Sequence, residues 1–433
     1  MTSAPRTPPP DRPIGLLHAT AMVVGIIIGA SIFVQPSEVN RHVPSVSGVL
    51  LVWLVAGLLS LAGALVCADL SSAFPRTGGV YVFLKETLSP GCGFLWGWAM
   101  FWSVHSGIIA AMAVIFGRYA AYFFALDERG IRLTAIAGIL LLSSVNYVGV
   151  RPGSILQTVV TAAKLLALLL ILGVVFVSGS SAAPAAAASA PPAAGLREFV
   201  LAVSAALFTF GGWHMVTYAA GETRNPEKTI PRALLIGTLA VTACYIALNA
   251  AYLYLLPLER VISSTRVAAD AAEALAGPRG AAAVSALVIL SSLGVLNGVI
   301  LAGPRMYFAM AQEGLAFRWM GALHPRFRTP HLALMAQAAW ASLLVATGTY
   351  RELFTRVIYT EWLFFALMTA GLLRLRRRSL YTPVYLLFVV ASVTVAACQI
   401  AADPWHAASG LLLVVLGLPA YLLWVRRGAH ANH

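Results

Sequence analysis

Two glycine-containing motifs lie inside long apolar stretches, where a membrane-crossing helix has no need of glycine. One is Gly25-Ile-Ile-Ile-Gly-Ala-Ser-Ile-Phe33, and the other is Phe208-Thr-Phe-Gly-Gly-Trp213. If the helix unwinds at these points, N–H groups at the start of one half-helix can hold a carboxylate. Carbonyls at the end of the other half-helix can hold an ammonium. A zwitterionic amino acid carries both groups. Such a site needs no charged side chain, and neither motif contains one.

Close packing is the alternative explanation, because small residues also let membrane helices approach each other. The two motifs fall in the first and sixth predicted spans, however, so they occupy matching places in two five-span halves. A pair of glycine-interrupted segments in corresponding positions is the best pointer in a sequence to the binding site of a transporter. The pair therefore favours a binding site over packing.

The composition predicts that most of the chain lies in a membrane. Of the 433 residues, 60% are hydrophobic and 10% are charged, with a mean hydropathy of +0.83, whereas a soluble domain has about 25% charged residues. A span needs roughly 20 mostly apolar residues, and about twelve stretches qualify. All should be helices, because lipid satisfies no backbone hydrogen bonds. The predicted spans are 14–39, 46–70, 91–122, 131–150, 153–178, 198–219, 233–257, 280–312, 331–348, 355–373, 382–401 and 406–425.

The net charge of +13 is distributed as in a membrane protein rather than a nucleic-acid-binding one. If the N-terminus is inside, most Lys and Arg residues lie in inner tails and loops, as the positive-inside rule requires. The run Arg374–Arg378 and the pair Arg426-Arg427 directly follow predicted spans, where they can contact anionic headgroups. Both termini are therefore predicted to be inside, and residues 1–13 form a short tail with no signal peptide.

The cysteines do not indicate a redox or metal site. The chain has no Cys-x-x-Cys pair, so neither a disulfide framework nor a metal site is expected, and no cofactor is expected either. The Ala/Pro/Ser tract Gly179–Gly195 cannot bury a core and should form a flexible outer loop. The four cysteines, all in or at the edge of predicted spans, are Cys67, Cys92, Cys244 and Cys398.

Motifs in order along residues 14–375 resemble the amino acid–polyamine–organocation superfamily, in particular its L-type amino acid transporter light-chain branch. The first-span motif, extended to Pro36, is similar to GxIIGSGIFVxP, and the sixth-span motif is similar to FAYGGW. The other matching segments are Ala163–Leu168, Gly221–Pro231, Leu296–Gly298, Pro304-Arg305, Glu313-Gly314, His324-Pro325, Thr329-Pro330 and Glu361–Leu363.

The resemblance implies an all-α polytopic membrane protein with a LeuT-type fold of twelve transmembrane helices. Helices 1–5 and 6–10 would form two inverted five-helix repeats, with helices 1 and 6 unwound in mid-membrane and two helices added at the end. The expected segments are 1–13 (inner tail), 14–178 (first repeat), 179–197 (outer loop), 198–375 (second repeat), 376–425 (helices 11 and 12) and 426–433 (inner tail).

The resemblance also implies roles for residues of both motifs. The substrate carboxylate would bind the backbone N–H groups of Gly29, Ala30 and Ser31. Its α-amino group would bind the carbonyls of Ile27, Phe208 and Gly211, with the Phe208 ring as the outer gate. The family's Gly-Ser-Gly is Gly-Ala-Ser here, and Ser31 adds a side chain where glycine lets backbone and ligand approach. We therefore expect a substrate with a small side chain.

Lys164 is the single basic residue in the interior of a predicted span, and an ionisable residue there is a functional candidate by default. By resemblance its ammonium would fill the place of a sodium ion in sodium-coupled relatives, near Ser291 and Ser292. It would serve as a permanently charged tether, or alternatively as a proton carrier. Tyr245 could reach toward Lys164 and the first span, although an ordinary interfacial tyrosine would also fit such a helix.

Four residues are candidates for a side-chain pocket, namely Thr209, Trp213, His214 and Trp362. His214 replaces an Asn of the family pattern, and both it and Trp362 could equally be packing residues. Asp69 and Glu222 are expected in inner salt bridges, and the turn Pro75–Gly79 is expected to support an inner gate.

These features predict a sodium-independent transporter of small to medium neutral L-amino acids that works as an exchanger. Proton-coupled symport is one alternative. Transport of cationic amino acids or polyamines is another, and Glu361 is the only spare carboxylate deep enough to serve it. An enzyme is not expected, because no span holds a metal-spaced His/Glu pair or a Gly-x-Ser-x-Gly element.

The expected location is a bacterial inner membrane. The light chains of the eukaryotic branch pair with a heavy-chain subunit through a cysteine in the outer loop after the third span. The corresponding segment Leu126–Leu133 has no cysteine. No heavy-chain partner and no nucleic acid are therefore expected, only the amino acid substrate and the lipid bilayer.

Overall fold

The computed structural model describes residues 14–75, 78–148, 195–376 and 380–430, together with Leu166 and Gly173. The predicted fifth span, including Lys164, lies outside these residues. The described part is helical, apart from one isolated bridge between Ile14 and Thr223. Its elements are α1 (Leu16–Ile27), η1 (Ser31–Phe33), α2 (Gln35–His42), α3 (Val46–Ala73), α4 (Val80–Thr87), α5 (Pro90–Ala99), η2 (Met100–Val104), α6 (His105–Phe124), α7 (Glu128–Val148), α9 (Leu196–Phe210), η3 (Trp213–Glu222), α10 (Pro226–Leu255), α11 (Leu258–Ser263), α12 (Val267–Gln312), η4 (Arg318–Gly321), α13 (His331–Thr347), α14 (Tyr350–Leu375), α15 (Thr382–Ala402), α16 (Pro404–Val415) and α17 (Gly417–His430).

Nine helices of the described part are long and apolar enough to cross a membrane, and α1 and α13 are shorter apolar helices. Helices cover every predicted span except the fifth. The polytopic all-α class is confirmed, whereas the count of twelve spans and the two inverted repeats stay predictions.

Two features differ from the sequence expectation. Between the predicted seventh and eighth spans, the chain forms α11 and the first turns of α12. Gly277 then adopts φ +66 ahead of Pro278, so α12 is two helices joined at a kink. The predicted third span contains a π-helical segment, η2, between α5 and α6. Such segments often occur at functional positions in helices.

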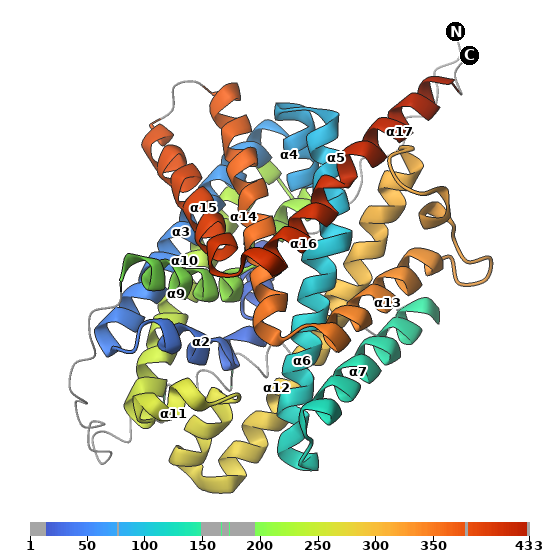
Figure 1. Cartoon of the computed structure of the whole chain (residues 1–433). Helices are drawn as coiled ribbons and strands as arrows, with labels where there is room; N and C mark the ends of the chain where they lie inside the picture. Colours follow the sequence, from blue (N-terminus) through green and yellow to red (C-terminus); the bar gives the residue numbers. More distant parts are fainter. Residues whose placement is uncertain are drawn as a thin grey trace.

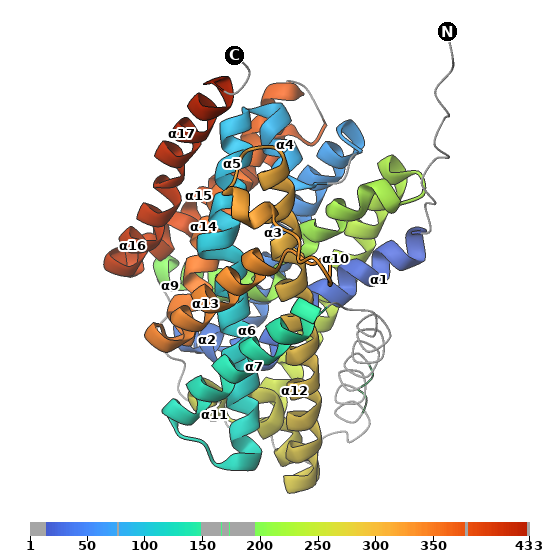
Figure 2. The ribbon, with the colours of Figure 1, turned by 90° about the vertical axis from the view of Figure 1, so that its right-hand side faces the viewer.

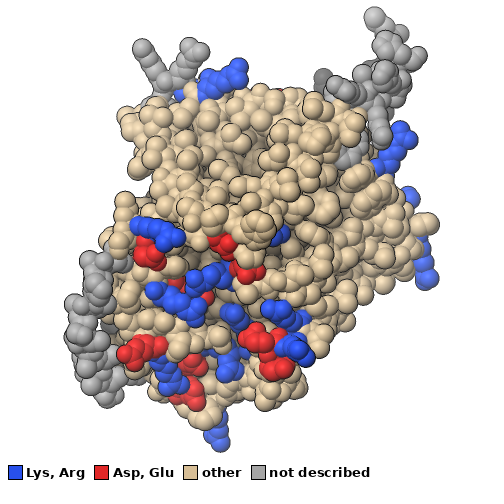
Figure 3. Space-filling model, viewed as in Figure 1, with Lys and Arg blue, Asp and Glu red and all other residues tan. Residues whose placement is uncertain are grey.

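The helices form an elongated bundle with two distinct ends (Figures 1 and 2). We name them the α4 end, which also holds the tip of α17, and the α11 end, which also holds α2. Charged side chains gather at the α11 end in the view of Figure 3, below a broad surface almost without charge. This distribution suits a protein whose middle faces lipid, because charged side chains are costly in the hydrocarbon core.

Glycines set how closely the central helices approach. A Cβ on Gly57 of α3 would overlap the side chain of Thr242 in α10, and one on Gly237 of α10 would lie 2.6 Å from Val23 of α1. Small residues at such contacts let membrane helices pack backbone to backbone. The three helices are thereby fixed around the start of the broken first span.

The α3–α10 contact gives a stability prediction. Gly57→Ala should lower the free energy of unfolding by about 1–3 kcal/mol, because the added methyl group overpacks the contact with Thr242. Gly298→Ala is the matched control, since a Cβ there meets no atom within 4 Å. It should be neutral or stabilising by up to about 1 kcal/mol, as alanine favours helix over glycine. Thermal unfolding of the purified variants measures both, and equal melting temperatures would contradict this account.

Candidate functional site

The first predicted span is broken at its glycine motif. α1 ends at Ile27, and Ile28 has φ −70 and ψ 78, outside the helical region. The N–H of Gly29 donates to the Ile27 carbonyl at 2.6 Å, which makes Ile28 the centre of an inverse γ-turn. A short 3₁₀ segment, η1, then leads into α2. The interruption therefore lies at residues 28–30, between two half-helices.

The sixth predicted span is broken in the same manner by a different turn. α9 ends at Phe210, Gly211 has φ −52 and ψ 150, and Gly212 has φ +94 and ψ −6. These angles are those of a type II turn, whose third position requires a positive φ and therefore favours glycine. The chain continues as the 3₁₀ segment η3. Gly212 is needed for a second reason, because a Cβ there would lie 2.6 Å from Ile26 of α1.

Tyr245 of α10 joins the two breaks. Its hydroxyl lies 2.9 Å from the Ile27 carbonyl and 3.3 Å from the Thr209 carbonyl. Each carbonyl belongs to the last turn of a half-helix, where the helix dipole places partial negative charge. The Tyr245 side chain is fully buried, with its ring against Trp53 and Phe210. The sequence prediction that Tyr245 reaches the first span is confirmed, and the structure adds its contact with the sixth.

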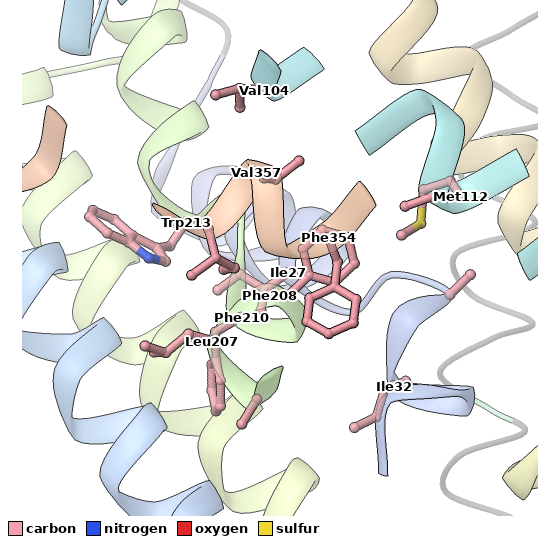
Figure 4. Close-up of a cluster of buried hydrophobic side chains, with 14 of the residues drawn as sticks. Ile27, Ile32, Val104, Met112, Leu207, Phe208, Phe210, Trp213, Phe354 and Val357 are labelled. Carbon is pink, nitrogen blue, oxygen red and sulfur yellow. The ribbon is translucent and has the colours of Figure 1, made fainter. Parts of the chain in front are cut away.

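An aromatic contact covers the breaks on the side of the α11 end. Figure 4 shows Ile27, Phe208 and Phe354 close together where α1, α9 and α14 meet. The ring centroids of Phe208 and Phe354 are 5.6 Å apart, and Phe354 in turn contacts Tyr350 at 5.5 Å. Phe208 is 7% exposed. Phe208 was predicted as the outer gate, and its ring packs against Phe354, which the sequence analysis did not single out.

Polar contacts close the α11 end beyond this aromatic pair. Glu38 of α2 accepts hydrogen bonds from Arg351 of α14 at 2.5 Å and from Arg41 at 3.3 Å. The hydroxyl of Tyr350 donates to the Gln35 side chain at 2.8 Å. The Glu38 side chain is only 9% exposed, so its charge depends on these partners. The half-helix α2 is therefore fixed to the start of α14.

Two other polar contacts hold α2 and η1 in place. His42 of α2 lies 2.7 Å from the Glu198 carboxylate of α9. The hydroxyl of Tyr119 in α6 donates to the Phe33 carbonyl at 2.8 Å. The segment after the first break is thus held from three sides, by α14, α9 and α6.

The α4 end is closed by a separate set of contacts. Asp69 of α3 forms an ion pair with Arg376 at 3.1 Å and accepts a hydrogen bond from Tyr385 at 2.9 Å. This confirms the ion pair expected for Asp69. A Cβ on Gly79, which has φ +51, would lie 2.6 Å from the Thr217 side chain. The turn ahead of α4 therefore packs directly on η3, as expected for a gate support. The side chain of Glu222 and residues 76–77 are outside the described part.

Glu313, just after α12, adds a contact at the same end. It accepts a hydrogen bond from the Tyr81 hydroxyl at 2.5 Å and lies 3.4 Å from the Lys85 ammonium. Burial, and then the bond to Glu313, raise the pKa of the Tyr81 phenol well above its ordinary value. Tyr81 is therefore a neutral donor at physiological pH, which links α4 to the end of α12.

The candidate pocket residues follow two patterns. Trp213 packs in the core, since a Cβ on Gly63 of α3 would lie 2.6 Å from its ring. Trp362 contacts Phe388 of α15 at 5.5 Å and Phe365 at 6.1 Å. Thr209 and His214 are fully buried, yet the Thr209 hydroxyl and both His214 ring nitrogens have no hydrogen-bond partner among the described residues. The two tryptophans therefore pack against neighbouring helices in this structure. Thr209 and His214 instead place polar atoms without a partner among the described residues beside the second break.

Ser291 and Ser292, the predicted neighbours of Lys164, lie on α12. Ser292 donates to the Val288 carbonyl at 2.5 Å, while the buried Ser291 hydroxyl has no partner in the described part of the chain. The predicted link to Lys164 cannot be placed, since Lys164 is outside the described residues.

Comparisons with known proteins identify the family. The model of the amino acid permease family matches residues 14–418. The chain belongs to the amino acid permease family. It is similar to the serine/threonine exchanger SteT of Bacillus subtilis (strain 168), with 31% identity over 96% of this chain and 98% of that protein. The human large neutral amino acids transporter small subunit 2 is 31% identical over 96% of this chain and 80% of that protein. The human cystine/glutamate transporter is 29% identical over 96% of this chain and 85% of that protein.

The family match confirms the resemblance to the amino acid–polyamine–organocation superfamily. The matched residues include both helix breaks and the contacts that close each end. The chain is therefore a multi-pass membrane transporter of amino acids and not an enzyme.

The sequence analysis missed the residues that close the α11 end of this permease. Glu38 and Arg351 lie at the ends of predicted spans, where charged residues are common and carry no special signal. Their separation of 313 positions hides the pairing. One signal was available in the sequence. Glu38 stands only two residues after Pro36 of the first-span motif, so this charged residue falls inside the predicted span rather than after its end.

The ion pair at the α11 end gives a coupling prediction. Glu38→Gln and Arg351→Gln should each lower the free energy of unfolding by about 1–3 kcal/mol, because a hydrogen bond to a charged group is lost. The double variant should cost less than the sum, with a coupling energy of about 0.5–3 kcal/mol.

Thermal unfolding in detergent measures all three variants. The exposed pair Arg260 and Glu273, 3.3 Å apart, is the matched control and should couple by only about 0–1 kcal/mol. Additive effects at Glu38 and Arg351 would show that the pair does not hold the closed end.

Proposed function

We propose that this permease is a sodium-independent exchanger of small to medium neutral L-amino acids that works by alternating access. The observation that carries the proposal is the pair of adjacent helix breaks, joined by Tyr245 and built without a charged side chain. Such a site provides carbonyls for an ammonium and N–H groups for a carboxylate, and therefore recognises the part that all amino acids share.

In this proposal the carboxylate binds the N–H groups of Gly29, Ala30 and Ser31. The Gly29 N–H now donates to the Ile27 carbonyl at 2.6 Å, so substrate binding would exchange this internal bond for one to the carboxylate. The released Ile27 carbonyl could then accept from the α-amino group. The carbonyls of Phe208 and Gly211 are the other proposed acceptors. Binding would thereby open the γ-turn and stabilise the unwound segment.

The two closed ends supply the gates for alternating access. We assign the α11 end to the outside and the α4 end to the inside, because the Arg-rich segment after α14 and the motif loop before α10 lie at the α4 end. Separating α2 from α14 would open the outer path past Phe208 and Phe354. Separating Gly79 from η3 and Arg376 from Asp69 would open the inner path. Each gate consists of a few polar contacts, so neither is costly to break.

Sodium independence is proposed from the sequence. Lys164, by resemblance, would supply a fixed positive charge where sodium-coupled relatives bind the ion, with Ser291 and Ser292 nearby. The buried, unpartnered hydroxyl of Ser291 is compatible with a partner from outside the described residues. We also propose from the sequence that the protein lies in a bacterial inner membrane and works as a single subunit without a heavy chain.

Transport by purified protein in liposomes tests the proposal. Labelled alanine or serine should enter vesicles preloaded with unlabelled amino acid, and not empty vesicles, because an exchanger needs substrate on both sides. The rate should be unchanged when sodium is replaced by choline. Protein-free vesicles are the control. If arginine or lysine enters while no neutral amino acid does, the substrate class is wrong.

A second prediction concerns the link between the two breaks. Tyr245→Phe should lower the exchange rate roughly fivefold, because one buried hydrogen bond is worth about 1 kcal/mol and a full tenfold change would need about 1.4 kcal/mol. Tyr122→Phe is the matched control, since that hydroxyl also bonds a backbone carbonyl, of Pro278 at 3.0 Å, at the bundle surface. It should exchange at the normal rate. Equal rates for both variants would remove Tyr245 from the site.

A further inference from the structure

Three arginines meet one carboxylate where the α11 end closes. Arg41 and Arg351 both donate to Glu38. Arg118 of α6 lies over the ring of Tyr350, the neighbour of Arg351 in the chain, with its guanidinium carbon 4.8 Å from the ring centre. These four charged side chains carry three positive charges and one negative charge, so the closed end has a surplus of positive charge.

Arg118 differs from the other two arginines because it has no acidic partner. None of the ion pairs formed among the described residues includes it, and its guanidinium makes no hydrogen bond to them. Its side chain is only partly exposed. A charge that leaves water needs compensation, and an aromatic face supplies only part of it. The Arg118 charge is therefore available to a ligand.

The position of Tyr350 relates this charge to the candidate site. The Tyr350 ring, which Arg118 covers, contacts the Phe354 ring at 5.5 Å. Phe354 in turn contacts Phe208 at 5.6 Å, and both lie close to Ile27 of the first break in Figure 4. One line of aromatic contacts thus leads from Arg118 to the proposed substrate cradle.

Opening of the proposed outer gate would change the partners of these charges. Separating α2 from α14 breaks the ion pair between Arg351 and Glu38. Glu38 moves with α2 and keeps Arg41, which belongs to the same helix. Arg351 and Arg118 stay behind on α14 and α6, which pack against each other. The wall of the open path would then hold two guanidinium groups with no carboxylate from the described residues.

We propose that Arg118 and Arg351 form a carboxylate-binding station in the open outer gate, which captures an amino acid before it reaches the cradle. The inference rests on the proposed function, because it requires a gate that opens at the α11 end. Guanidinium groups bind carboxylates through charge-assisted hydrogen bonds, and a mouth of one charge sign concentrates groups of the opposite sign. The substrate carboxylate takes the place that Glu38 holds in the closed state and then passes to the N–H groups of the first break.

The station also affects which substrates enter from the outside. Its two positive charges attract any amino acid through the carboxylate, whatever the side chain. They oppose arginine, lysine and polyamines, because like charges brought together disfavour a partner. An uncharged cradle reads only the groups that all amino acids share. The arginines of the gate therefore supply the selection for neutral over cationic substrates that the cradle does not.

Serine exchange in cells and in inside-out membrane vesicles tests the inference, because the station faces only the outside. Both are preloaded with unlabelled serine, and values from cells with an empty vector are subtracted. Arg118→Gln should raise the half-saturating concentration of external serine about tenfold in cells, since a charged hydrogen-bond partner is lost. The maximal rate should not change. In inside-out vesicles, where the α4 end faces the medium, the half-saturating concentration should equal that of the wild type.

Two further variants complete the series. Arg118→Lys keeps the charge but loses the paired N–H groups, so its value in cells should fall between those of the wild type and Arg118→Gln. Arg132→Gln is the matched control. Arg132 lies in the first turns of α7, which starts at the α11 end (Figure 1), and its guanidinium donates to the Ala346 carbonyl at 3.0 Å. Its loss removes the same charge from the same end and should change neither value.

L-Lactate supplies a second probe, because it is alanine with a hydroxyl group in place of the amino group. In wild-type cells it should compete with external serine more strongly than the same concentration of chloride does. Arg118→Gln should lose this difference. If Arg118→Gln does not reach the membrane, the wild type decides alone. Stronger competition by lactate in cells than in inside-out vesicles supports the station, and equal competition on both sides overturns it.

The outcomes separate the two proposals. Failure of the wild type to exchange serine or alanine would overturn the proposed function. Normal exchange by the wild type, with an unchanged half-saturating concentration for Arg118→Gln in cells, would overturn the station alone. An equal rise in cells and in inside-out vesicles would overturn it as well, because a change on both sides indicates damage to the fold rather than loss of an outer site.

Discussion

The structure depends on how a membrane protein satisfies backbone groups where a helix is interrupted. An apolar surrounding offers no water to a free carbonyl or N–H group, so each break needs internal partners. The first break closes on itself through the γ-turn at Ile28, and the second through the type II turn at Gly211-Gly212. Tyr245 then supplies one hydroxyl to both half-helices. The breaks are therefore a single unit, and whatever binds at one changes the hydrogen bonding available to the other.

The break between α1 and α2 also allows the two half-helices to be fixed separately, which the proposed gates need. An intact helix transmits movement along its length, whereas α1 and α2 are joined only by a turn and a 3₁₀ segment. α2 and η1 can thus be fixed to α14, α9 and α6 by their own contacts, independently of α1, which packs through Val23 on Gly237 of α10. The closures at the two ends share no residue. In the proposed alternating access, one set of contacts could therefore loosen while the other stays in place.

Much of this arrangement could be predicted from the sequence, because membrane spans and helix breaks are local properties. Apolar length located the helices, and the glycine motifs located both interruptions within a few residues. The pairings between distant segments could not be predicted in this way. Nothing near Glu38 or Arg351 indicates that the two meet, and Trp213 and Trp362, both candidates for a pocket, pack against α3 and α15 instead. Side chains that follow a break can point to either side, and only the tertiary fold decides which.

The same limitation applied to Glu361, which the sequence suggested as a partner for a cationic substrate. Its surroundings favour a different interpretation. A pocket built for a cation would surround the carboxylate with polar donors that keep it charged, as Arg351 and Arg41 do for Glu38. Glu361 instead lies about one turn before Phe364 and Phe365 on α14, and its Oε1 atom has no hydrogen-bond partner among the described residues. A neutral acid tolerates these surroundings and a carboxylate does not.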